Sequence, residues 1–169
     1  MSAVIETLTQ SEIYLSGTGS AATSEVLSRE QVISSVASSP RASLKIRLQV
    51  PSPNRALIGT VVKLFALRNL RAGWDSYGAQ PIRQEIIERT AQWIPSILQA
   101  STPEPAVVPQ AEGGLQLEWH RKGIDLEIYM DSPGNIHFSA EDRTSGEADE
   151  VALAGNEDLL RKWVARISD

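Results

Sequence analysis

Cysteine is absent from this chain of 169 residues, which excludes disulfide bonds, cysteine-ligated metal centres and thiol catalysis together. Long apolar runs are absent as well, since no run approaches the length of about 20 residues that a membrane helix needs. Residues 1–6 lack the basic start and the apolar core of a secretory signal. With 41% hydrophobic and 22% charged residues, the composition matches that of a globular protein with one full-sized domain. We therefore expect a cytoplasmic protein that does not enter a membrane.

Acidic residues are missing from the segment between Glu30 and Asp75. The basic residues of that segment are Arg41, Lys45, Arg47, Arg55, Lys63, Arg68 and Arg71. Acidic residues gather instead between residues 141 and 158, around Arg143. Such segregation can provide a basic patch for nucleic acid, an acidic patch for a basic partner, or two ends that attract each other. Charge runs are, however, more often ordinary solvated faces.

The N-terminal part of the chain differs in composition from the rest. Residues 1–42 are rich in Ser, Thr, Gly and Ala and show little hydrophobic periodicity, which is typical of a flexible tail. Residues 43–169 are predicted to form a single α+β domain, which begins with an edge strand over residues 44–50.

Helical spacing of apolar residues predicts three helices in this domain. The first covers residues 57–70, the second runs from residue 81 or 82 to residue 98 with a disturbance at Pro95, and the third follows Asn156 as its cap. The loop between the first two, residues 73–81, contains two glycines and two aromatic residues. We expect it to be ordered, with Trp74 and Tyr77 pinning it to the core.

Alternating apolar and polar residues predict an antiparallel sheet of three to five strands, packed against two to three helices. The clearest strands are residues 115–120 and 124–130, where every second residue is apolar. Further strands are predicted at residues 106–108 and 136–140, and a less clear one at residues 151–153. In that scheme, residues 141–150 form a hairpin loop.

Two motifs stand out in this framework. The first motif follows an apolar helix and consists of Gly73-Trp74 with Gly78 and Pro81. The second motif follows Pro109 and reads Gly113-Gly114-Leu115-Gln116-Leu117-Glu118-Trp119. In this order the motifs resemble a family of small, largely uncharacterised bacterial proteins, over roughly residues 57 to 140 of this chain. The chain carries Pro109-Gln110 where members of that family often carry Pro-Thr. The resemblance implies the fold class and a bacterial origin, and it transfers no activity.

The polar face of the predicted sheet is the main candidate for chemistry. Paired carboxylates near a histidine can bind a divalent metal or act as acid and base, yet antiparallel sheets commonly solvate such a face or cover it with a partner. Glu118 could be a base or ligand together with Glu127, or could bond to the loop of Trp74–Tyr77 or to Arg121. Gly113-Gly114 precedes no helix and suits a bend better than a phosphate loop. The polar positions are Gln116, Glu118, His120, Asp125, Glu127, Tyr129 and His137.

Three functions follow, in order of preference. The first is a non-enzymatic protein–protein interaction module, such as an antitoxin, an immunity factor or an accessory subunit of a larger bacterial assembly. The second is nucleic-acid binding through the basic segment of residues 41–71, and the third is a small metal-dependent hydrolase that uses the polar sheet face. A homodimer paired at a sheet edge is also compatible with the pattern. We predict no catalytic set, no metal site and no cofactor, and the predicted binding residues are Trp74, Asp75, Tyr77, Glu118, Glu127, Arg41, Lys45 and Arg47.

Overall fold

The computed structural model describes residues 11–13, 48–50 and 55–168. The chain divides into two units, residues 1–53 and residues 54–169. In the first unit, β1 (Ser11–Ile13) pairs antiparallel with β2 (Leu48–Val50). The strand predicted for residues 44–50 is thus described only over its last three residues. The remainder of the predicted tail, and its predicted boundary at residue 42, lie outside the described residues.

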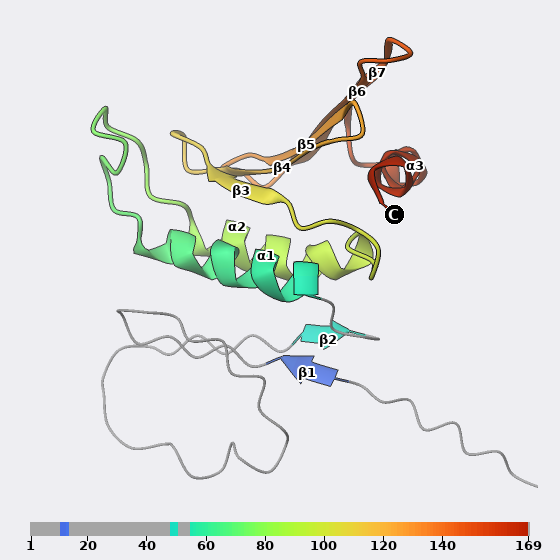
Figure 1. The fold of residues 1–169 in the computed structure, drawn as a ribbon. Coiled ribbons are helices and arrows are strands. Elements are labelled where there is room, and N and C mark those ends of the chain that lie inside the picture. Colours follow the sequence, from blue (N-terminus) through green and yellow to red (C-terminus); the bar gives the residue numbers. More distant parts are fainter. Residues whose placement is uncertain (1–10, 14–47, 51–54, 169) are drawn as a thin grey trace, which may run out of the picture. The chain divides into compact units, whose positions relative to one another are not determined.

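The second unit is an α+β fold built on a five-stranded antiparallel sheet, as predicted (Figure 1). Each strand pairs with its neighbour in the chain, in the order β3-β4-β5-β6-β7. The strands are β3 (Ala106–Pro109), β4 (Leu115–Arg121), β5 (Ile124–Met130), β6 (Ile136–Asp142) and β7 (Glu147–Ala152).

The predicted hairpin loop over residues 141–150 is wrong. Strand β6 continues to Asp142 and β7 begins at Glu147, which leaves only residues 143–146 for the turn. The segment looked like a loop because it is rich in acidic residues. Two of these residues, Glu147 and Asp149, instead bond to side chains of the last helix, which lies far from them in sequence.

Three α-helices lie on one side of the sheet: α1 (Arg55–Ala66), α2 (Gln84–Trp93) and α3 (Glu157–Ile167) (Figure 1). Short 3₁₀ turns follow the first two, η1 (Leu67–Asn69) and η2 (Ile94–Ser96). The second helix therefore ends earlier than predicted. Pro95 lacks an amide hydrogen and clashes with the preceding turn, so the chain tightens there instead of continuing as an α-helix.

Asn156 occupies the N-cap position of α3, as predicted, but its side chain does not cap the helix. Its amide Nδ2 donates to the carbonyl oxygen of Ala152 at 2.9 Å. The side chain therefore ties the start of the helix back to the end of β7.

The hydrophobic core lies between the helices and the sheet face that they cover. Apolar residues repeat at every second position of β4 and β5 and at helical spacing on α1 and α3, so each element contributes one face. The largest fully buried side chains include Leu57, Leu64, Ile87, Leu115, Leu117, Leu126, Ile128, Phe138, Leu160 and Trp163. The opposite, polar face of the sheet has no helix of the second unit over it (Figure 1). Among the described residues, no helix is both long and apolar enough to cross a membrane.

Candidate functional site

Residues 73–80, within the connection between η1 and α2, form a loop closed by hydrogen bonds, named here loop 73–80. The indole Nε1 of Trp74 donates to the carbonyl oxygen of Gln80 at 3.0 Å. The amide of Gly73 donates to the carbonyl oxygen of Ala79 at 2.7 Å, which closes the base of the loop. Ala79 itself is buried. The predicted order of this loop therefore has a specific cause, which is a set of bonds between its two ends.

Asp75 fixes the tip of loop 73–80. Its Oδ1 accepts the backbone amides of Tyr77 at 2.8 Å and Ala79 at 2.9 Å. The amide of Ala79, followed by that of Tyr77, stabilises the charged carboxylate and lowers the pKa of Asp75. Ser76 adopts the left-handed region at a φ of 69°, which is uncommon for a residue other than glycine. The loop thus holds one strained conformation through backbone bonds.

Tyr77 projects from this loop into solvent. Its side chain is 94% exposed. Among the described residues, Tyr77 is the only large hydrophobic residue that is exposed. The prediction that both aromatic residues pin the loop to the core is therefore wrong for Tyr77. Trp74 is half-buried and closes the loop, whereas Tyr77 points away from the core.

The turn at residues 110–114 joins loop 73–80 to the sheet. The amide of Gln80 donates to the carbonyl oxygen of Ala111 at 2.7 Å. The glycines of this turn have separate roles: Gly113 has a φ of 90°, and a Cβ on Gly114 would lie 2.5 Å from the carbonyl oxygen of Met130. The Gly-Gly pair is thus explained by backbone geometry and close approach.

The polar face of the sheet places carboxylates in a row across the strands. Glu118 of β4 lies opposite Glu127 of β5, followed by Ser139 of β6 and Glu150 of β7. Like charges directly opposite each other are destabilising in a sheet. A face that keeps them has either compensating contacts or a partner that supplies positive charge.

Side-chain amides partly compensate this row. Gln110 donates from Nε2 to Oε1 of Gln116 at 2.7 Å, and Gln116 donates from its own Nε2 to Oε2 of Glu127 at 2.7 Å. This chain of bonds fixes one oxygen of Glu127 in place. The other oxygen accepts no hydrogen bond from the part of the chain that the structure describes.

Next to Glu127, the polar face is hollowed into an open depression of about 490 Å³. Tyr129 forms one side of it, and its hydroxyl donates to Oε1 of Glu112. Burial, followed by this bond, raises the pKa of Tyr129 to about 12, so the phenol keeps the proton that it donates to Glu112. The polar side chains that line the depression are Gln116, Glu127, Tyr129, His137, Ser139 and Glu150.

A second cluster lies at the other end of the polar face. Nδ1 of His120 lies 2.6 Å from Oδ1 of Asp125, and its Nε2 lies 3.6 Å from Oε2 of Glu118. Arg143 pairs with the second oxygen of Asp125. The bond to Asp125 raises the pKa of His120, and the bond to His120 lowers the pKa of Asp125. Each partner thus favours the charged form of the other, and half of the imidazole surface is open to water.

No group of three or more His, Cys, Asp or Glu side chains within the described residues is arranged to hold a metal ion. The two histidines of the polar face, His120 and His137, lie on different strands. The pairs seen here are ion pairs and hydrogen bonds between residues of the sheet itself.

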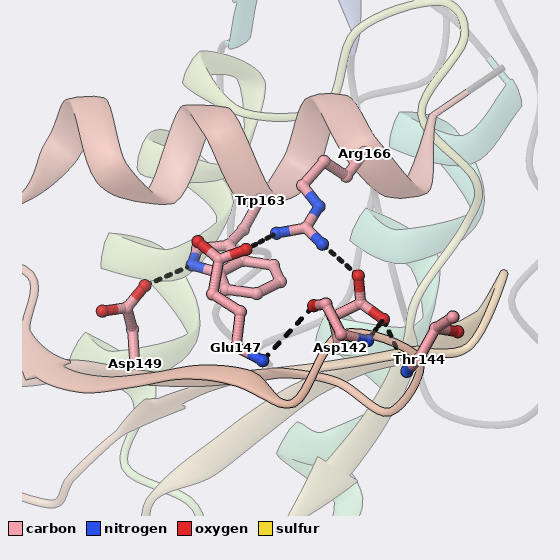
Figure 2. Close-up of polar contacts among 7 residues, drawn as sticks. Asp142, Thr144, Glu147, Asp149, Trp163 and Arg166 are labelled. Carbon is pink, nitrogen blue, oxygen red and sulfur yellow. Dashed lines mark hydrogen bonds and ion pairs between the residues drawn. The ribbon is translucent and has the colours of Figure 1, made fainter.

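A further polar cluster attaches α3 to the β6–β7 hairpin (Figure 2). The guanidinium carbon of Arg166 lies 4.1 Å from the centroid of the Trp163 ring. Its Nη1 donates to Oε2 of Glu147 at 2.8 Å, and its Nη2 pairs with Asp142. The indole Nε1 of Trp163 donates to Asp149 at 2.8 Å. Because the polar groups of Arg166 and Trp163 bond within the cluster, we assign it a structural role.

The predicted binding residues fall into separate places. Trp74, Asp75 and Tyr77 lie together in loop 73–80, and Glu118 and Glu127 lie opposite each other on the sheet, as predicted from the alternation. Arg41, Lys45 and Arg47 lie outside the described residues. Sequence reasoning missed Glu112, Ser139 and Glu150 as members of the polar face.

The described part of the basic segment is partly engaged in local contacts. Nζ of Lys63 lies 2.6 Å from Oε1 of Glu104 and donates to the carbonyl oxygen of Pro105. The guanidinium carbon of Arg68 lies 6.0 Å from the centre of the Phe65 ring. The ion pair with Glu104 offsets the charge that Lys63 could otherwise offer to phosphates.

Comparison with protein-family models, with curated proteins and with solved structures found no match for this chain. The resemblance to the family of small bacterial proteins therefore stays a prediction.

Proposed function

We propose that this protein is a non-enzymatic protein–protein interaction module, in the manner of an accessory subunit, antitoxin or immunity factor of a larger bacterial assembly. The observation that carries the proposal is the exposure of Tyr77 on an ordered loop. A tyrosine offers a large amphipathic contact surface with little rotamer entropy to lose, and for this reason it is enriched at binding hot spots.

The loop is suited to this role because its conformation is set before binding. Bonds from Asp75 and Trp74 hold the backbone, so little further ordering is needed when a partner covers Tyr77. An isolated exposed tyrosine on a mobile loop would have to lose more entropy on contact. A preorganised aromatic at the tip of a loop therefore favours recognition of another macromolecule.

The test is affinity purification of the tagged full chain from cells of its own organism, in three forms. These are the unchanged protein, Tyr77→Ala, and Gln92→Ala as a control at an exposed position of α2. We expect one stoichiometric protein partner with the unchanged chain and with the control. Loss of a hot-spot tyrosine should reduce recovery with Tyr77→Ala by about tenfold or more.

Nuclease treatment of half of each sample separates the alternatives. Partner recovery that survives nuclease supports a protein interface, whereas recovery that collapses with nuclease favours nucleic-acid binding instead. Equal recovery with Tyr77→Ala and with the unchanged chain would show that Tyr77 is not at the interface. Thermal unfolding of each variant serves as the control for folding, because an exposed side chain should change the midpoint by no more than about 2 °C.

A further inference from the structure

The depression on the polar face has free hydrogen-bonding capacity. Within the described residues, neither Ser139 nor Glu150 has a hydrogen bond or an ion pair from its side chain, and one oxygen of Glu127 has no donor. Glu127 is held by Gln116, while Ser139 and Glu150 are exposed. A ligand that enters this depression therefore meets acceptors without having to break bonds of the protein.

The spacing of these acceptors follows from the sheet. Glu127, Ser139 and Glu150 occupy one row on β5, β6 and β7, so the two carboxylate-bearing residues are two strands apart. Neighbouring strands lie about 4.8 Å apart, which places the two backbone positions roughly 10 Å from each other. Glutamate side chains shorten that gap from both sides. The remaining space suits a flat cationic group that donates in two directions.

We propose that this depression receives an arginine side chain from a basic segment of a partner protein, with its guanidinium between Glu127 and Glu150 above Ser139. A guanidinium is planar and carries five N–H donors, so it can bond to both carboxylates at once. A lysine ammonium is compact and would favour one of them. The ring of Tyr129, whose orientation is fixed by its bond to Glu112, supplies an aromatic surface beside the same position.

The charge of the surrounding face favours a segment with further basic residues. Glu118 continues the same row, and Glu141 and Asp125 lie in the next row. His120 and Arg143 pair with Asp125 there, whereas Glu127 and Glu150 have no cationic partner among the described residues. An acidic face of this kind repels phosphates and attracts Lys and Arg. This inference rests on the proposed interaction function and specifies the chemical class of the partner.

The experiment is a titration followed by amide signals of the ¹⁵N-labelled full chain, with capped tetra-arginine peptide as the probe in low salt. We expect shifts centred on the amides of Glu127, Ser139 and Glu150. The double variant Glu127→Gln, Glu150→Gln should bind about tenfold more weakly. The control variant Glu157→Gln, Asp158→Asn changes the charge equally at exposed positions of α3 and should bind within about twofold of the unchanged chain.

Two further probes keep the inference open to contradiction. Tetra-lysine peptide should bind about threefold more weakly than tetra-arginine, because one ammonium cannot bridge both carboxylates. The variant Ser139→Arg places a guanidinium in the depression permanently and should abolish the shifts. Shifts spread evenly over all acidic surfaces, or an equal loss of affinity in the α3 control, would overturn the inference.

The result of the peptide titration is independent of the result of the affinity purification with Tyr77→Ala. Partner capture that depends on Tyr77, together with a depression that ignores tetra-arginine, would refute only the arginine site. Specific binding of tetra-arginine at Glu127 and Glu150 without any captured protein would instead refute the proposed interaction function.

Discussion

Substitution of Arg166 by methionine should loosen helix α3 from the β6–β7 hairpin. Methionine keeps much of the side-chain length but loses the guanidinium, which stacks on Trp163 and bonds to Glu147 and Asp142 (Figure 2). The stacking contributes about 1 kcal/mol, because Arg166 is only one-third exposed. The pair with Glu147 is more exposed and adds a few tenths of a kcal/mol, roughly.

Together these contacts predict a loss of about 1–2 kcal/mol in the free energy of unfolding. For a folded unit of this size, the loss corresponds to a drop in the thermal midpoint of roughly 4–8 °C. The assay is thermal and urea unfolding followed by circular dichroism, with tryptophan fluorescence as a second probe. Trp163 is buried beside the substituted residue, so its emission should report a local change.

Arg161→Met is the matched control on the same helix. Arg161 pairs only with Asp158 in the described contacts, and both side chains are mostly exposed. Its loss should cost less than about 0.5 kcal/mol. High salt should weaken the ion pairs of Arg166 but leave its stacking on Trp163. If Arg166→Met is no more destabilising than Arg161→Met, the cluster does not hold α3 to the hairpin.

Two other perturbations test local features. Gly114→Ala should destabilise strongly and shift the amide signals of β4 and β5, because its Cβ would lie 2.5 Å from the carbonyl oxygen of Met130. Gly146→Ala is the control, since a Cβ there meets open space. It should show only the cost of its positive φ, about 1 kcal/mol. For His120 and Asp125, the raised and lowered pKa values stabilise the fold in the window between the unfolded values, about pH 4 to 6.5. This contribution fades as pH rises through the raised pKa of His120, or falls through the lowered pKa of Asp125. Unfolding of His120→Asn at pH 5.5 and at pH 9 should therefore differ from the unchanged protein at the lower pH only, and an equal difference at both would contradict the assignment.

The alternation of apolar residues predicted β4 and β5 well because their register is set by a single buried face. It failed at β7, where Glu147 and Asp149 face the helices and are satisfied by Arg166 and Trp163. That compensation comes from residues about fifteen to twenty positions further along the chain, and local patterning cannot reveal it. Alternation predicts strands only where the inward positions are apolar.

The candidate site was predictable to a similar extent. Glu118 and Glu127 could be placed on one face from their spacing alone, whereas Glu150 could not, since its strand had been predicted as a loop. In loop 73–80 the sequence offered two aromatic residues three positions apart and no signal to separate their roles. The separation goes with the bonds of the loop: Trp74 bonds back to Gln80, Asp75 holds the amide of Tyr77, and the Tyr77 side chain is left exposed.

The sequential pairing of the five strands has a consequence for how the chain folds. Each hairpin is closed by a short turn, so its pairing needs little loop-closure entropy, and we expect the sheet to assemble on a timescale of roughly milliseconds. Helix α3 is synthesised after the whole sheet, because it follows β7 in the chain. During synthesis, β6 and β7 can therefore pair before the helix that covers them has left the ribosome. Until then the sheet lacks the helix that contacts β5 in the folded chain, and this interval is when we expect the chain to be most prone to aggregation.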